Sequence, residues 1–140
     1  MRIYLASSWR NTSQPEVLRA LRDAGHEVYD FRNPPGGEWD SRGPWWTKAP
    51  SSDLKEAERL KAMAFAIDYE YMEWAEVFVL LLPCGKSAHL EAGWATGRGK
   101  RVLILNPNLN HENELMYRLA GTPCMYMTLY GLLEALKDGR

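Results

Sequence analysis

The sequence predicts a single α/β domain (1–140) built on a doubly wound, five-stranded parallel sheet. Three observations lead to this fold class: strand-like and helix-like segments alternate along the chain, one strand-like segment is apolar without interruption, and 140 residues fit one domain. The uninterrupted run is Val77 to Leu82, and such runs are typical of strands buried on both faces of a parallel sheet. The sequence therefore favours a Rossmann-like or flavodoxin-like arrangement with right-handed crossovers.

The individual elements follow from periodicity and from residues that start or stop helices. The expected strands are 2–6, 27–30, 77–82, 101–105 and 124–127, and the expected helices are about 13–24, 53–74, 87–96, 112–120 and 128–137. Ser13 with Glu16 forms a potential capping box, Ser87 and Thr128 are potential N-caps, and Gly25 is suited to a left-handed helix stop. The helix that begins at 53 is expected to run to about 66 and to continue through Asp68 to 74, either directly or after a break, with Asp68 near its end or bend.

Residues 31–51 are expected to form a long loop, because they contain four of the eight prolines and show no sustained periodicity. Loops of this length inside a compact domain are often binding loops or lids. The segment contains Trp39, Asp40, Trp45 and Trp46. The tryptophans are candidates for stacking on a nucleobase, or for burial beneath the loop or in a contact between subunits, and Asp40 for a polar edge of a ligand.

Composition excludes several classes of partner. The net charge is −1, with 17 basic and 18 acidic residues, so no long-range field attracts a nucleic acid polymer or a membrane surface. The apolar start is too short for a signal peptide or a spanning helix. Cys84 and Cys124 form no scaffold pattern, which is typical of a reducing compartment. We expect a cytoplasmic protein.

The ligand site of a doubly wound sheet lies beyond the carboxyl ends of its strands, at the point where the strand order reverses. This rule selects the segment after the first strand, the loop after the second, and residues 83–91 after the third. In the first segment, the hydroxyls of Ser7 and Ser8 are candidates for binding a sugar or phosphate. Arg10 is a candidate for pairing with an anion, or for simple solvation.

Residues 83–93 carry the most chemistry. A Walker-type phosphate loop would need a glycine where Leu80 stands, and a cysteine phosphatase would need an arginine where Leu90 stands. A redox or nucleophilic Cys84 is a further alternative, because a helix N-terminus lowers thiol pKa values. His89 and Glu91 are two residues apart on a helix and point to different sides, so we expect no metal and no cofactor.

Glu91 remains the strongest candidate for a reactive group. It lies in the first turns of the expected helix, where the helix dipole favours an ionised carboxylate. A carboxylate suits attack on an anomeric carbon, because the transition state there resembles an oxocarbenium ion. The alternative is that Glu91 is a helix-start residue favoured by the dipole alone.

Taken together, three features resemble the nucleoside 2-deoxyribosyltransferase superfamily, which includes the nucleotide N-hydrolases. They are Ile3-Tyr4-Leu5-Ala6 opening a strand, Asp68 before an apolar strand, and Leu90-Glu91-Ala92-Gly93-Trp94-Ala95 followed by Gly97 and Gly99-Lys100. The resemblance spans roughly residues 1–136. It implies a covalent glycosyl enzyme at Glu91, with Asp68 near the sugar or base and Tyr4 near the carboxylates. It also implies a homodimer or higher homo-oligomer, in which a neighbouring subunit completes the site, with Met116 and Tyr117 as candidates for reaching it.

The chain departs from the transferase pattern at Gly85, where transferases of this superfamily usually place an aspartate. This favours hydrolysis over base exchange. Lys86, Ser87 and the backbone amides of a helix N-terminus are suited to a 5′-phosphate, although Ser87 is equally suited to plain N-capping. The expected substrate is a nucleoside or nucleoside monophosphate.

Other interpretations stay open. Asp68 is either a proton donor or hydroxyl ligand in the site or a solvated helix carboxylate, and His89 either contacts substrate or lies at the surface. The same fold also suits an NAD glycohydrolase-type enzyme, which nicotinamide release would reveal. A third possibility is a nucleotide-binding sensor without turnover, which would show ligand-induced melting shifts alone.

Overall fold

The computed structural model describes residues 1–35, 44–50, 52–108 and 114–138. The strands are β1 (Arg2–Ala6), β2 (Glu27–Tyr29), β3 (Val77–Leu81), β4 (Arg101–Leu105) and β5 (Met125–Tyr126). The α-helices are α1 (Gln14–Asp23), α2 (Leu54–Trp74), α3 (Lys86–Gly97) and α4 (Leu129–Lys137), and the 3-10 helices are η1 (Trp45–Thr47) and η2 (Leu115–Ala120).

The strands form one parallel sheet in the order β2-β1-β3-β4-β5. The order reverses between β1 and β3, because the chain moves outward to β2 from β1 and returns to the other side for β3. Ligands of such sheets bind outside the carboxyl ends of the strands at this reversal. The predicted doubly wound sheet of five strands is confirmed, and its reversal point lies where the segments after Ala6 and Leu81 meet.

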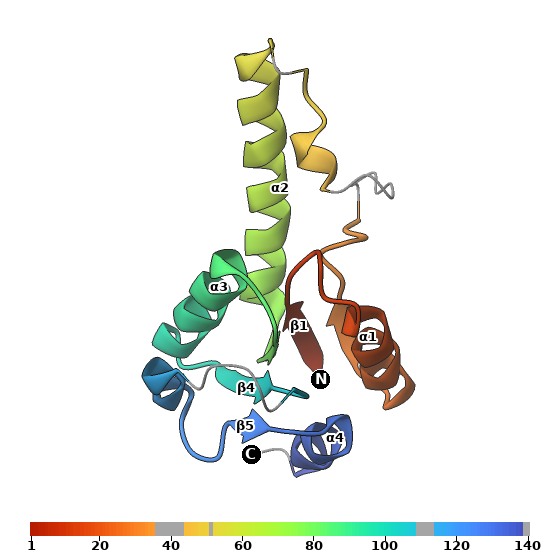
Figure 1. The fold of residues 1–140 in the computed structure, drawn as a ribbon, viewed down its shortest axis with the longest axis vertical. Coiled ribbons are helices and arrows are strands. Elements are labelled where there is room, and N and C mark those ends of the chain that lie inside the picture. The colour runs from red at the N-terminus through yellow and green to blue at the C-terminus, as the bar shows by residue number, and fades with distance from the viewer. Residues whose placement is uncertain (36–43, 51, 109–113, 139–140) are drawn as a thin grey trace.

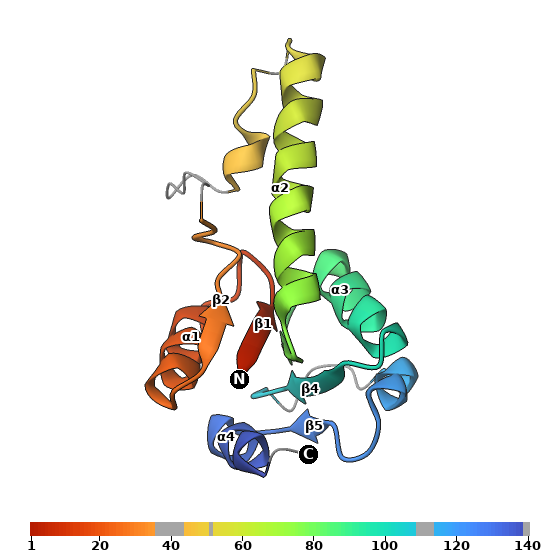
Figure 2. The same cartoon turned by 180° about the vertical axis from the view of Figure 1, so that it is seen from behind.

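Helices cover both faces of the sheet, as the two views in Figures 1 and 2 show. The α2 and α3 face buries the side chains of Tyr4, Phe78, Leu80 and Ile104. The α1 and α4 face buries alternate residues of the same strands, a set that contains Ile3, Leu5, Val77, Val79, Leu81, Leu103 and Leu105. This alternation is the physical reason that β3 is apolar throughout, since both of its faces are covered.

α2 is one unbroken helix of 21 residues, so the expected continuation through Asp68 is confirmed and no break or bend occurs near this residue. Its N-cap is Asp53, whose side chain accepts a hydrogen bond from the Glu56 N–H at 2.9 Å. The helix extends well beyond the edge of the sheet, and η1 lies beside its projecting part (Figure 1). Asp68 therefore lies within the helix, in the stretch that approaches the sheet.

The structure confirms Ser13 as the N-cap residue of α1 but corrects the predicted capping contacts of Ser13 and Ser87. The Ser13 side chain makes no capping bond; instead the Asn11 side-chain oxygen accepts from the Ser13 N–H at 2.9 Å. α3 begins at Lys86 with Gly85 as N-cap, so Ser87 lies in its first turn. Thr128 caps α4 as predicted, accepting from the Gly131 N–H at 3.1 Å.

The remaining differences concern helix type and element length. The predicted helix at 112–120 is a 3-10 helix at 115–120, with 112 and 113 outside the described residues. The strands at 27–30, 77–82 and 124–127 are shorter than predicted. Gly25 ends α1 with a φ of +86°, a conformation that favours glycine.

No helix among the described residues is long and apolar enough to cross a membrane.

Candidate active site

Glu91 lies in the second turn of α3, on the side of this helix that faces α2. The small buried side chains of Ala88, Ala92 and Ala95 let α3 pack closely on the sheet. The Glu91 carboxyl is thereby brought over β1, where the Tyr4 hydroxyl donates a hydrogen bond to its Oε1 at 3.2 Å.

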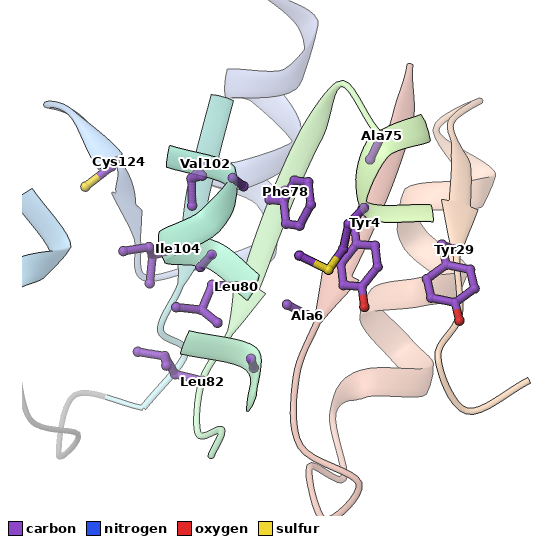
Figure 3. Close-up of a cluster of buried hydrophobic side chains, with 14 residues drawn as sticks. Tyr4, Ala6, Tyr29, Ala75, Phe78, Leu80, Leu82, Val102, Ile104 and Cys124 are labelled. Carbon is purple, nitrogen blue, oxygen red and sulfur yellow. The ribbon is translucent and has the colours of Figure 1, made fainter. Parts of the chain in front are cut away.

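Asp68 reaches the same region from α2. The Tyr29 hydroxyl donates a hydrogen bond to Asp68 Oδ1 at 2.6 Å. Tyr4 and Tyr29 are paired in register on β1 and β2, and their ring centroids are 5.2 Å apart. Figure 3 shows the two rings side by side with both hydroxyls pointing the same way. Two neighbouring strands therefore hold two carboxyl groups, each through a buried tyrosine.

Both carboxyl groups line one cleft, which we call the α2–α3 cleft. Its volume is about 620 Å³. The lining residues are Trp46, Lys61, Ala64, Phe65, Asp68, Tyr69, Met72, Ser87, Leu90, Glu91 and Trp94. Its walls are mostly apolar and aromatic, and its polar groups are few, which is typical of a pocket for a small organic ligand.

Burial sets the protonation of Glu91. Removal from water and the nearby charge of Asp68 raise its pKa to about 8, against the opposing effect of the Tyr4 hydrogen bond. The expectation that the helix dipole keeps Glu91 ionised is therefore wrong for the free protein. The reason is that the dipole acts mainly within the first turn, whereas Glu91 lies in the second turn and is largely removed from water.

Two opposing effects act on the pKa of Asp68. Burial raises the pKa of Asp68, and the short hydrogen bond from Tyr29 lowers it. Burial and the two carboxylates also raise the pKa values of Tyr4 and Tyr29, so both hydroxyls remain protonated donors. The two carboxyl groups therefore differ in environment, which is the condition for dividing acid and nucleophile roles.

The predicted sugar or phosphate ligands after β1 are engaged in local contacts. The Ser7 hydroxyl donates to the Leu81 carbonyl at 3.0 Å, which links the ends of β1 and β3. The Ser8 hydroxyl accepts from the Arg10 N–H at 3.1 Å, and Arg10 itself is exposed. These residues lie at the predicted edge of the sheet, and in this structure the two hydroxyls shape the loop.

Three of the predicted binding residues lie on the far side of α3. Gly85, Lys86 and His89 line a second cleft of about 740 Å³ between α3 and η2, which we call the α3–η2 cleft. His89 Nδ1 lies 2.8 Å from the Gly85 carbonyl, and its Nε2 lies 2.9 Å from the Tyr117 hydroxyl. Ser87 alone of this predicted group lines the α2–α3 cleft with Glu91.

Cys84 is not an activated thiol. Burial and the charge of Glu91 raise its pKa to about 12, so the helix N-terminus does not lower it. Among the predicted loop tryptophans, Trp46 lines the α2–α3 cleft, whereas Trp39 and Asp40 lie outside the described residues. In the described ranges, no three His, Cys, Asp or Glu side chains are grouped as metal ligands.

Three residues of the site region were not predicted from the sequence. Tyr29 was detectable, because placing the two expected strands side by side brings Tyr4 and Tyr29 level. Lys61 lies seven residues before Asp68, which places both residues on one face of a continuous helix, two turns apart. The sequence left the continuity of this helix open, so Lys61 was not singled out. Asn11, whose Oδ1 accepts from the N–H of the N-cap residue Ser13 and whose Nδ2 donates to the Pro83 carbonyl at 3.1 Å, gave no signal that singled it out.

No protein-family model and no curated protein matches the chain. Solved structures do. A 2-deoxyribosyltransferase from Bacillus psychrosaccharolyticus aligns with a TM-score of 0.66 and 21% identity, covering 95% of this chain and 90% of that chain. The chain has the fold of a nucleoside 2-deoxyribosyltransferase.

Two further structures share this deoxyribosyltransferase fold. The CMP N-glycosidase of Clostridium botulinum aligns with a TM-score of 0.57 and 18% identity, covering 98% of this chain and 99% of that chain. A conserved protein of Enterococcus faecalis aligns with a TM-score of 0.62 and 16% identity, covering 99% and 98%. The transferase and the N-glycosidase both belong to the nucleoside 2-deoxyribosyltransferase-like superfamily, so the fold implied by the sequence resemblance is confirmed.

Proposed function

We propose that this chain breaks the N-glycosidic bond of a nucleoside or nucleoside 5′-monophosphate, with Glu91 as nucleophile. The observation that carries the proposal is the pair of half-buried carboxyl groups, Glu91 and Asp68, each held by a tyrosine hydroxyl beside one cleft. The shared fold supports the same chemistry, because its known examples include a 2-deoxyribosyltransferase and a CMP N-glycosidase.

We propose the following division of roles between the two carboxyl groups. A Glu91 carboxylate oxygen bonds to C1′ while the C1′–N bond breaks, and the electron pair of that bond moves to the base nitrogen. Asp68 donates a proton to the departing base. Water then attacks C1′ and gives its proton to Asp68, and the bond between C1′ and Glu91 breaks to restore the carboxylate. The charge on Glu91 stabilises the oxocarbenium-like transition state in both steps.

Hydrolysis is preferred over base exchange because position 85 is a glycine. Gly85 is the N-cap of α3 and offers no carboxyl group to a second base. A 5′-phosphate is favoured by Ser87 and Lys61, which line the cleft with the carboxyl groups and supply a hydroxyl and a positive charge. Lys86 lines the neighbouring α3–η2 cleft, at the same end of α3.

The test is release of free base from a panel of ribo- and deoxyribonucleosides, their 5′-monophosphates and NAD, followed by chromatography. We expect release from at least one nucleoside or monophosphate and a loss of about 10³-fold or more in Glu91→Gln. Glu70→Gln is the matched control, because Glu70 is an exposed carboxylate on α2. Absence of base release from every compound would contradict the proposal. Release of nicotinamide alone would instead indicate an NAD glycohydrolase.

Adding a second free base distinguishes hydrolysis from transfer. Hydrolysis gives the free sugar or sugar phosphate at a rate that the added base does not change. Appearance of a new nucleoside as the main product would contradict the hydrolase assignment. Comparing KM values for a nucleoside and its monophosphate, in the wild type and in Ser87→Ala and Lys61→Met, tests the need for the phosphate.

We also propose that the protein acts as a homo-oligomer. Phe65 and Leu90 line the α2–α3 cleft and are 67% and 74% exposed in the single chain. Large apolar side chains gathered beside a site are typical of a protein contact surface. Sedimentation velocity should give a mass of at least two chains, and Phe65→Glu should lower it. A monomer at micromolar concentration would contradict this assignment.

A further inference from the structure

Arg32 makes an unusual set of contacts for a residue outside the carboxyl pair. Its Nη2 donates hydrogen bonds to three backbone carbonyls, those of Ser8 at 2.8 Å, Trp9 at 3.1 Å and Asn11 at 2.7 Å. All three carbonyls belong to the segment of residues 7–11, which we call the β1 loop. A single nitrogen from the loop after β2 therefore fixes the backbone of the loop after β1.

This arrangement carries an energetic cost that ordinary surface arginines avoid. The Nε atom of Arg32 is buried and has no hydrogen-bond partner among the described residues. A buried donor without a partner costs about 1–3 kcal/mol. The three hydrogen bonds from Nη2 to backbone carbonyls offset this cost and hold the Arg32 side chain in place.

The β1 loop is connected to the candidate site on two sides. Trp9 packs edge-on against Phe31 with ring centroids 5.3 Å apart, and both rings, with Asp68, line a small cavity of about 20 Å³. Asn11 donates to the Pro83 carbonyl in the segment that precedes α3 and Glu91. A change in the β1 loop would thus reach the surroundings of both carboxyl groups.

The contacts also determine where the loop's peptide N–H groups point. In a trans peptide, the carbonyl and the following N–H point in opposite directions. Because the carbonyls of Ser8 and Asn11 turn toward Arg32, the N–H groups of Trp9 and Thr12 turn away from it. Neither N–H has a partner among the described residues, so both are available as donors at the edge of the sheet where ligands bind.

We propose that Arg32 is a positioning residue that holds the β1 loop in the shape that receives the substrate. The proposal rests on the proposed function. The hydrogen bonds of the Arg32 side chain go to backbone carbonyls, whereas Tyr4 and Tyr29 hold Glu91 and Asp68. Loss of the Arg32 contacts should therefore weaken substrate binding while leaving the chemical step largely intact.

The test compares Arg32→Met, which keeps a long apolar stem, with Arg32→Lys and with the control Arg22→Met. Arg22 also donates to a backbone carbonyl, that of Val28 at 3.0 Å, but at the other end of α1. For the best substrate of the panel, we expect Arg32→Met to raise KM about tenfold or more and to change kcat less than about threefold. The pH dependence of kcat should not move.

Arg32→Lys should give an intermediate KM, because one ammonium group can donate to several of the carbonyls that Nη2 now contacts. Arg22→Met should behave as the wild type. Thermal melting confirms that each variant is folded at the assay temperature, and Arg32→Gln replaces Arg32→Met if the latter does not fold. An unchanged KM in a folded variant, or a lower kcat with unchanged KM, would overturn the proposal.

Hydrogen exchange separates failure of this inference from failure of the proposed function. If the wild type releases no base from any substrate, the proposed function fails, but the loop amides can still be measured. Exchange at the Asn11 and Ser13 amides, which donate to the Ser8 carbonyl at 3.0 Å and to Asn11 Oδ1 at 2.9 Å, should then accelerate about tenfold in the Arg32 variant and remain unchanged in Arg22→Met. Unchanged exchange at these amides in the Arg32 variant would overturn the positioning role itself.

Discussion

Replacing Glu91 by glutamine should make the protein more stable, and the gain should grow with pH. Glutamine keeps the size of the side chain and an oxygen that accepts from Tyr4, but it cannot ionise. The pKa of Glu91 in the folded protein is about 8, against an ordinary value of 4.5. Between these values the folded protein retains a proton that the unfolded chain has lost, so wild-type stability falls as pH rises.

The size of the effect follows from these two values. Each pH unit across the interval is worth about 1.36 kcal/mol. Relative to the fully protonated state, Glu91 therefore costs the wild type roughly 1 kcal/mol at pH 5 and roughly 3 kcal/mol at pH 7. The variant removes this cost, so its advantage should increase by about 2.5 kcal/mol between pH 5 and pH 7. Burial of the neutral amide has its own cost, but that cost does not depend on pH.

The assay is urea denaturation, followed by tryptophan fluorescence, at pH 5, 6, 7 and 8. The quantity of interest is the difference in unfolding free energy between Glu91→Gln and the wild type, plotted against pH. Glu70→Gln is the control and should give a difference that does not follow this trend, because Glu70 is exposed. A flat difference for Glu91→Gln across this range would refute the argument, because it would mean that Glu91 ionises as in the unfolded chain.

The other predictions concern rates and the α1 cap. The rate of base release should fall above about pH 8, because Glu91 and Asp68 are then both ionised and no proton is left for the departing base. The Asp68→Asn variant should release base more slowly, and its rate should not fall above pH 8. Tyr29→Phe should move the acidic limb of the same profile to higher pH, because the hydroxyl that lowers the pKa of Asp68 is lost; an unmoved limb would contradict the role of Tyr29. In urea denaturation, Asn11→Ala should cost about 1–2 kcal/mol and Ser13→Ala less than about 0.5 kcal/mol, and equal losses would contradict the assignment of the side-chain contact to Asn11.

The order of the elements and the sheet could be predicted from the sequence because their signals are local. Val77 to Leu82 is apolar throughout since β3 is covered on both faces, and Gly25 marks a left-handed turn that the structure contains. The side-chain contact at the start of α1 could not be predicted in the same way. Ser13 is the N-cap residue that the sequence predicts, but the side chain that contacts its N–H is that of Asn11, which also binds the Pro83 carbonyl, 72 residues away in the sequence.

The candidate site could also be predicted only in part from the sequence. Glu91 and Asp68 could be selected from residue type, position and resemblance, but their protonation could not, because burial by α2 and α3 is a tertiary property. Lys61 and Asp68 share one face only because α2 is continuous, and the sequence left that continuity open. Likewise, sequence distance could not reveal that Lys86 and Ser87, which are adjacent, line different clefts on the two sides of α3.

The two carboxyl groups are best treated as one site that holds one proton near neutral pH. In the free protein that proton lies mainly on Glu91, because burial and the nearby charge of Asp68 raise the pKa of Glu91 to about 8. The proposed attack needs the opposite arrangement, with Glu91 charged and Asp68 protonated. Both arrangements carry the same net charge, so a substrate can favour the reacting one without any exchange of protons with solvent. The positive charge that develops at C1′ stabilises a charged Glu91, and the departing base takes its proton from Asp68, so both demands of the transition state favour that arrangement.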